Sequence, residues 1–186
     1  MANSEKTLVV VTGNKGKAAE IASITGWSVE AQNLDIAEIQ SLDVEEVAKS
    51  KALAAYKIIQ RPVVVDDTGM SIEALNGLPG ALVSWFLDTL GPKGILDLLP
   101  DIVDRRASVC TCVGYADQNG ARTFVGKIEG RLSSSLRGEN GFGYDPIFIP
   151  EGQERTYAEM TSEEKNAISM RKMALMEFKE YLSTLE

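Results

Sequence analysis

Two short valine-rich runs, at residues 7–12 and 62–65, constrain the fold of this chain most. Apolar runs of this length and composition are typical of buried strands. Residues 17–25 follow the first run with helical spacing, and residues 44–59 precede the second with their apolar side chains on one stripe. Because strands and helices alternate in this part of the chain, we predict a mixed α/β fold around a buried sheet.

The rest of the chain predicts a strand hairpin and further helices. Residues 106–115 and 123–131 have the composition of paired strands with a short turn between them. Thr161 and Glu164 have the spacing of a capping box, which predicts a helix start, and Ser169 is positioned to cap a second helix. The other expected elements are strands at 29–34 and 146–149, helices at 79–90 and 94–99, and turns at 66–69 and 117–120.

Size and composition limit the class of protein. The chain has 186 residues, of which 44% are hydrophobic, so we expect a single domain over residues 1–186 with a full core. The net charge of −8 argues against broad nucleic-acid binding, which needs a basic surface. We expect neither a membrane span nor a signal peptide, because no long uncharged apolar segment is present. Cys110 and Cys112 would share one face of a strand as free thiols, as expected of a cytoplasmic protein.

The chain contains no histidine. This excludes Ser–His and Cys–His nucleophile pairs, zinc sites of the HExxH type and a histidine general base. Any catalysis must therefore come from carboxylates, lysines, tyrosines or a hard metal such as Mg²⁺ that oxygen atoms hold.

Two adjacent acids, Asp66 and Asp67, follow the second valine-rich run. Open α/β sheets bind ligands at this end of a strand. Neighbouring strand residues point to opposite sides, so one acid can face a metal while the other braces the turn. Glu38, Glu45 or Glu46 could add a further carboxylate, and the sequence alone does not choose among them. The alternative is a solvated acidic turn or a helix cap.

Cationic residues suggest an anionic ligand. Residues 12–17 join a strand to a helix, where backbone N–H groups and lysines can bind an anion, although a simple turn has the same composition. Arg171 shares the apolar stripe of the last helix, and an inward-facing cation needs an anion. Lys51 lies in a lysine-containing helix whose pattern is typical of a solvated face.

A loop with alternating glycine and aromatic residues, 141–145, completes the set of candidate features. Glycine lets the backbone approach a ligand closely, and an aromatic ring can stack on a flat one. The alternative is a glycine-rich hairpin whose aromatic side chains pack against it and bind no ligand. Together with Lys165 and Arg171, the loop suggests a nucleotide ligand.

In their order along the chain, these motifs resemble the inosine triphosphate pyrophosphatase family, which hydrolyses non-standard purine triphosphates. The resemblance extends over residues 7–178. The matching positions are Thr12, Asn14 and Lys17, and the segments 66–69, 77–80, 142–146 and 164–169.

The resemblance implies a two-lobed mixed α/β fold with a long central sheet and an active cleft between the lobes. It also implies a homodimer and a purine nucleoside triphosphate as substrate. The implied reaction converts ITP, dITP or XTP to the monophosphate and pyrophosphate with Mg²⁺, which cleanses the nucleotide pool.

The resemblance also implies roles for individual residues. Asp67 would be the catalytic proton acceptor, and Asp67 and Glu38 would be the metal ligands. Residues 12–17 would hold the triphosphate, and residues 142–145 would hold the sugar and the base. The implied substrate-binding residues are Thr12, Gly13, Asn14, Lys15, Gly16, Lys17, Lys51, Thr68, Phe142, Gly143, Tyr144, Asp145, Lys165, Met170 and Arg171.

One position departs from the family pattern, which usually has histidine where this chain has Met170. Methionine can pack against a base but cannot reproduce the hydrogen bonds of histidine, so base selectivity is affected more than hydrolysis. We expect Arg171 and the N–H groups of the Phe142 loop to donate to the 6-oxo group of the base. The alternative functions are a pyrophosphatase of standard or pyrimidine triphosphates and a nucleotide-binding module without turnover.

Overall fold

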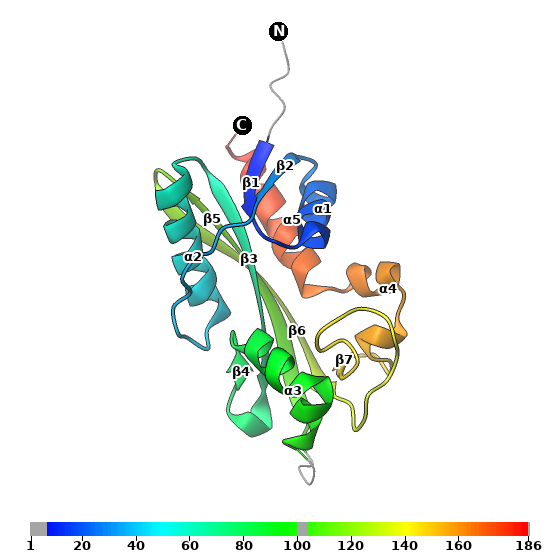
Figure 1. Cartoon of the computed structure of the whole chain (residues 1–186). Helices are drawn as coiled ribbons and strands as arrows, with labels where there is room; N and C mark the ends of the chain where they lie inside the picture. Colours follow the sequence, from blue (N-terminus) through cyan, green and yellow to red (C-terminus); the bar gives the residue numbers. More distant parts are fainter. Residues whose placement is uncertain (1–6, 100–103, 186) are drawn as a thin grey trace.

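The computed structural model describes residues 7–99 and 104–185, which form a mixed sheet with helices on both faces (Figure 1). The strands are β1 (Thr7–Val11), β2 (Ser28–Gln32), β3 (Val63–Ile72), β4 (Pro79–Gly80), β5 (Arg106–Asp117), β6 (Gly120–Leu132) and β7 (Phe148–Pro150). The helices are α1 (Lys15–Thr25), α2 (Val44–Ile59), α3 (Val83–Asp97), α4 (Ser162–Ala167) and α5 (Met170–Ser183). The predicted mixed α/β fold is confirmed.

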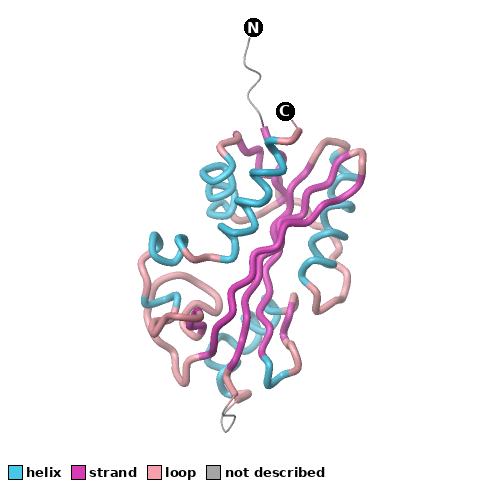
Figure 2. The backbone as a smooth tube through the Cα atoms, turned by 180° about the vertical axis from the view of Figure 1, so that it is seen from behind, coloured by secondary structure: helices cyan, strands magenta, loops and turns pink. Residues whose placement is uncertain are grey.

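The sheet combines a parallel and an antiparallel part. Its strands follow the order β2-β1-β3-β5-β6-β7, and β4 lies beside β3. β1 pairs in parallel with β2 and β3, whereas β5, β6 and β7 add antiparallel ladders. Seen from behind, the long strands run through the molecule between the helices (Figure 2). The predicted hairpin is β5 and β6, and its turn lies at the predicted position.

Alternate residues of β3 face different helices. Val63 and Val65 pack in one apolar cluster with Ala48 of α2. Val64 packs in another cluster with Phe178 of α5, to which α1 also contributes. Helix α2 therefore covers one face of the sheet, and α1 and α5 cover the other (Figure 1). This alternation decides which way each of the two following acids points.

The two acids lie inside β3, so the turn predicted at residues 66–69 is wrong. β5 pairs with β3 over the full length of β3 and keeps residues 66–69 extended. β1 pairs with β3 only at Val63 and Val64. Asp66 and Asp67 therefore lie just beyond the carboxyl end of β1, where an α/β sheet leaves room for a ligand.

The helices follow the predictions in part. Helix α2 spans the predicted residues 44–59, and Ser169 caps α5 after the predicted break. The helices predicted at 79–90 and 94–99 are parts of one element, α3, in which the backbone of Gly91 interrupts the helix with a φ of 68°. Residues 79–80 form β4 instead of the start of that helix.

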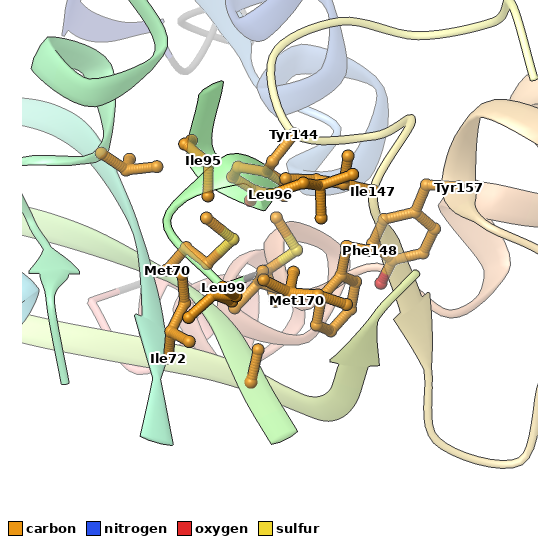
Figure 3. Packing of buried hydrophobic residues seen from close by; sticks show 14 of the residues in the cluster. Met70, Ile72, Ile95, Leu96, Leu99, Tyr144, Ile147, Phe148, Tyr157 and Met170 are labelled. Carbon is orange, nitrogen blue, oxygen red and sulfur yellow. The ribbon is translucent and has the colours of Figure 1, made fainter. Parts of the chain in front are cut away.

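A third apolar cluster fills the end of the sheet beyond the acids (Figure 3). Met70 and Ile72 of β3 pack there with Leu99 and with Phe148 of β7. Met170, the first residue of α5, belongs to the same cluster. The cluster thus holds the start of α5 against the sheet, close to the acids.

The structure bears on the predicted state of the cysteines and on the predicted lack of a membrane span. Cys110 and Cys112 lie in β5 as free thiols, as predicted. Within residues 7–99 and 104–185, none of the helices combines the length and the apolar character that a membrane crossing requires.

Candidate active site

A cavity of about 690 Å³ opens around the two acids. Its walls come from the β1–α1 turn, β3, α2, α3, the loop at 142–145 and the α4–α5 segment. Every residue predicted for the site lines this cavity except Lys15 and Gly16, which lie exposed in the first turn of α1. The fold therefore brings together motifs that are far apart in the sequence.

Asp67 faces α2, as the alternation along β3 requires. The Lys51 ammonium group, from α2, lies 2.7 Å from Asp67 Oδ1 and 2.6 Å from Glu38 Oε1. The Lys51 side chain is only 18% exposed, so the alternative of a solvated helix face is wrong for this lysine. Of the three candidate glutamates, Glu38 is the one beside Asp67, because Glu45 bonds to Thr123 and Glu46 bonds to Ser41.

The Asp67 carboxylate has the properties of a base and of a ligand. Burial raises its pKa, and the charge of Glu38 adds to the rise, whereas Lys51 and Lys17 act in the opposite direction. Its Oδ2 atom is buried and has no hydrogen-bond partner among the described residues. A desolvated, unpaired carboxylate oxygen can accept a proton or coordinate a cation.

The pair Asp67 and Glu38 fits a Mg²⁺ ion that the protein shares with a phosphate ligand. No group of three or more acidic or cysteine side chains within residues 7–99 and 104–185 is arranged to hold a metal. Mg²⁺ commonly takes one or two carboxylates and completes its octahedron with water and substrate phosphates. The unpaired Oδ2 of Asp67 provides one free ligand atom for such an ion.

Asp66 faces the opposite side of the sheet, toward α1 and α5. Lys17 of α1 contacts Asp66 Oδ1, and the Arg171 Nε–H of α5 donates to Asp66 Oδ2 over 2.9 Å. Burial alone would raise the pKa of Asp66, but Lys17 and Arg171 outweigh it and hold the pKa below its usual range. Asp66 is therefore held by two cations, whereas Asp67 is paired, among the described residues, with Lys51 alone.

The turn at residues 12–17 has fewer free N–H groups than expected. Asn14 caps α1, and its Oδ1 accepts from the N–H groups of Gly16 and Lys17 over 2.9 and 3.2 Å. The N–H of Asn14 donates to Thr12 Oγ1 over 3.0 Å. These three amides are engaged within the turn, and the Lys17 ammonium group is the cation that the turn brings to the cavity.

The loop at 142–145 is divided between the cavity and the core. The Phe142 side chain is 65% exposed, and the Lys165 ammonium group lies 4.9 Å from the centre of its ring. Tyr144 is buried in the third apolar cluster, together with Met170. Phe142 is therefore the aromatic residue of this loop that is exposed at the cavity.

The buried Asp145 carboxylate holds the loop at 142–145 in place. Its Oδ2 accepts from the Phe142 N–H over 2.8 Å and pairs with the Lys165 ammonium group. The Phe142 N–H is therefore not free to donate to a base, contrary to the expectation from the sequence. Lys165, between Asp145 and the Phe142 ring, is a cationic donor at this end of the cavity.

Several polar cavity residues were not predicted. Asn33 directly follows β2, a parallel strand that ends at the same edge of the sheet as β1, so its position after a strand was a usable signal. Ser84 and Asp88 lie one helical turn apart on α3, whose start the sequence placed too early. Glu20 and Asn166 also line the cavity. Asn166 lies in the matching segment 164–169 but was given no role, and no sequence motif identifies Glu20.

Known proteins of similar sequence match nearly the whole chain. The sequence profile of the Ham1 family matches residues 8–181. The dITP/XTP pyrophosphatases of Saccharolobus solfataricus and Methanopyrus kandleri are 43% and 45% identical over 94% of this chain, and the matches cover 93% and 95% of those proteins. The inosine triphosphate pyrophosphatase of Schizosaccharomyces pombe is 39% identical over 96% of each chain.

Solved structures agree with the sequence matches. The Ham1 protein of Staphylococcus aureus superposes with a TM-score of 0.89 at 30% identity, covering 97% of this chain and 100% of its own. A HAM1 protein from Coxiella burnetii superposes with a TM-score of 0.86 at 32% identity, covering 96% of this chain and 99% of its own. The sequence profile spans every cavity residue from Val11 to Arg171. The chain therefore belongs to the Ham1 family.

Proposed function

We propose that this protein is a nucleoside triphosphate pyrophosphatase that converts ITP, dITP and XTP to the monophosphate and pyrophosphate. The observation that carries the proposal is the buried, unpaired Oδ2 of Asp67 in a cavity that Lys17, Lys51, Lys165 and Arg171 also line. Relatives named dITP/XTP pyrophosphatase and inosine triphosphate pyrophosphatase support the same substrate class.

The cations are suited to a triphosphate. Lys17, Lys51, Lys165 and Arg171 come from four different helices, so they can reach a polyanion from several sides. Each already has a carboxylate partner, which balances the charge of the free cavity. A lysine ammonium group has three donors, so each lysine can keep its carboxylate and still donate to a phosphate oxygen.

The chemical step is hydrolysis at the α-phosphorus. Negative charge grows on the bridging and non-bridging oxygens, and the lysines stabilise it. The Asp67 carboxylate orients the attacking water and accepts its proton, a role that its raised pKa favours. A Mg²⁺ ion held by Asp67 and Glu38 would supply Lewis-acid stabilisation and would lower the pKa of bound water.

Selection of the base follows from hydrogen-bond donors. Hypoxanthine and xanthine carry a 6-oxo acceptor, whereas adenine carries an amine, which would leave a donor in the site unpaired. Lys165 lies over one face of the exposed Phe142 ring, so a base bound at this end of the cavity would have both an aromatic surface and this cationic donor within reach. Met170 lies buried in the floor and adds apolar contact without a hydrogen bond.

We also propose that the protein is a homodimer, as the resemblance implies. Trp85, in the first turn of α3, is 69% exposed, which is unusual for so large an apolar side chain. Leu42 and Leu78 are also exposed, and Leu42 contacts the β4–α3 connection through its carbonyl oxygen. A second copy of the chain would remove this apolar surface from water.

Release of pyrophosphate tests the proposed reaction. ITP, XTP, GTP, ATP and dUTP are compared with Mg²⁺ present and with the metal removed by EDTA. We expect ITP and XTP to exceed the other nucleotides in kcat/KM by at least about tenfold, and EDTA to abolish release. A preference for ATP or dUTP would show that the proposed substrate class is wrong. Nucleotide binding without pyrophosphate release would show that the protein is a binding module and not an enzyme.

A further inference from the structure

We infer that Asp66 is a positioning residue that holds Lys17 and Arg171 in the orientation in which they bind the nucleotide. The inference rests on the proposed function. It adds to that function a residue that neither contacts the nucleotide nor holds the metal.

Each oxygen of the Asp66 carboxylate contacts a cation from a different helix. Lys17 of α1 contacts Oδ1, and the Nε–H of Arg171 of α5 donates to Oδ2 over 2.9 Å. The Lys17 ammonium group also lies 3.3 Å from the Asp66 carbonyl oxygen, and Arg171 reaches Glu20 over 3.4 Å. One side chain of β3 thus connects α1 and α5 across the cavity wall.

Asp66 is a fixed point for these two flexible side chains. Its backbone pairs with Val113 of β5 in the middle of the sheet, and its side chain is 1% exposed. Lysine and arginine lose much rotamer entropy when they are immobilised. Because Asp66 orders both cations before the nucleotide arrives, less of this entropy remains to be lost on binding.

Asp66 is not placed to act on the substrate itself. Both of its oxygens are directed at cations on the α1 and α5 side of the sheet. Asp67, the next residue, points to the α2 side, where it meets Lys51. Loss of Asp66 should therefore weaken nucleotide binding by Lys17 and Arg171 and leave the rate of the chemical step largely unchanged.

Steady-state kinetics of Asp66→Asn separate these possibilities. Asparagine keeps the shape but removes the negative charge that pairs with both cations and replaces one oxygen by an NH₂ group. We expect KM for ITP to rise about tenfold while kcat changes by less than about threefold. Asp104→Asn, which breaks an exposed Asp–Arg pair with Arg106, is the matched control and should leave both constants unchanged.

Two kinetic outcomes would overturn the inference. A fall in kcat with an unchanged KM is what a smaller folded fraction produces, and it would make the role of Asp66 purely structural. A loss of kcat as large as that of Asp67→Asn would make Asp66 part of the chemistry. If Asp66→Asn does not fold, Arg171→Lys replaces it, because lysine keeps the charge but lacks the Nε–H donor. A rise in KM of about tenfold is again expected, and an unchanged KM would overturn the inference.

A double-mutant cycle tests whether Asp66 acts through Lys17. Lys17→Gln removes one of the two cations that Asp66 positions. We expect Asp66→Asn to raise KM by a clearly smaller factor in the Lys17→Gln protein than in the wild type, because residues that act together are not additive. Independent, multiplicative effects on KM would overturn the inference.

Hydrogen exchange of arginine side chains provides a readout that does not depend on activity. The Arg171 Nε–H, bound to buried Asp66, should exchange with water at least about tenfold more slowly than the Arg106 Nε–H, which donates to exposed Asp104 over 3.0 Å. Equal exchange rates in ¹⁵N-labelled wild-type protein would overturn the inference. Absence of pyrophosphate release from every nucleotide would instead refute the proposed function and leave this measurement intact.

Discussion

Two neighbouring aspartates of one strand have opposite electrostatic environments. Asp66 is enclosed by two cations, which lower its pKa despite burial. Asp67 shares one lysine with Glu38, and burial raises its pKa. The sequence predicted that the two side chains would point to opposite sides. The resemblance gave a role to Asp67 alone. The role of Asp66 depends on which helices bring cations to its face, which the sequence does not show.

Replacement of Asp67 tests its catalytic role. We expect Asp67→Asn to lower kcat about 10³-fold, because the asparagine side chain can neither accept the proton of the water nor coordinate Mg²⁺ as a carboxylate does. Nucleotide affinity should persist, because the lysines and Arg171 remain. Pyrophosphate release measures the first effect, and calorimetric titration with ITP measures the second. Turnover close to that of the wild type would remove Asp67 from the mechanism.

The same two aspartates should affect folding stability with opposite sign. The folded-state pKa of Asp66 is lowered, so its stabilisation is present above the unfolded pKa and is lost as the pH falls through the folded pKa. The folded-state pKa of Asp67 is raised, so its contribution is present below the unfolded pKa and is lost as the pH rises through the folded pKa. At pH 7 we expect Asp66→Asn to lower the free energy of unfolding by about 3 kcal/mol. Asp67→Asn should leave it unchanged or raise it.

Urea unfolding in EDTA measures both variants against the wild type. The matched pair controls for position, because the residues are adjacent in β3 and undergo the same substitution. The destabilisation by Asp66→Asn should shrink as the pH is lowered from 7 toward about 3, below the usual aspartate pKa. Equal destabilisation by the two substitutions at pH 7 would contradict the assigned environments.

At the scale of elements, the sequence predicted the helices and strands whose boundaries depend on neighbouring residues. Helix α2 was predicted at residues 44–59 because its apolar stripe is regular and Pro62 follows it. The hairpin of β5 and β6 was predicted because its turn residues are distinctive. The continuation of β3 past the acids was missed, because its cause is pairing with β5, about 40 residues later in the chain. The start of α3 was missed for a similar reason, since residues 79–80 pair with β3.

A glycine in β6 sets how closely α5 approaches the sheet. A Cβ atom at Gly126 would clash with the carbonyl oxygen of Met170 and would lie 2.9 Å from the backbone nitrogen of Ala174. Met170 precedes Arg171, so this contact fixes the start of the helix that brings Arg171 to Asp66. The spacing between β6 and α5 is thus part of the geometry of the site.

Gly126→Ala tests this dependence. We expect the added methyl group to push the start of α5 outward, to lower the free energy of unfolding by about 2 kcal/mol and to raise KM for ITP. Val125→Ala is the matched control, because the adjacent side chain is partly exposed and points to the other face of β6. Urea unfolding and pyrophosphate release measure the two effects. A Gly126→Ala protein with wild-type stability and KM would show that the helix start is not constrained here.

At the scale of the whole molecule, the sheet is the frame that assembles the site. Strand β3 holds the two acids in fixed positions, and the helices around the sheet bring cations from distant parts of the sequence to them (Figure 1). The residues that the motifs predicted all line the cavity except Lys15 and Gly16, because the resemblance extends over the whole fold. Asp66 had to be recognised from its contacts, since its partner Arg171 lies 105 residues away. Surface features such as exposed Trp85 have no local signal and appear only in the folded molecule.

Trp85 provides the test of the proposed homodimer. Burial of a tryptophan side chain in an interface contributes about 2–4 kcal/mol, and a glutamate at the same place would have to lose its hydration without a partner. We therefore expect Trp85→Glu to weaken the dimer at least about a hundredfold and to leave the fold of the monomer intact. Sedimentation velocity over a range of concentrations measures the first effect, and circular dichroism checks the second. Ile58→Glu, at an apolar residue of α2 that is 61% exposed, is the matched control and should remain dimeric. A wild-type protein that stays monomeric at every concentration would refute the dimer, and a Trp85→Glu protein that still dimerises would place the interface elsewhere.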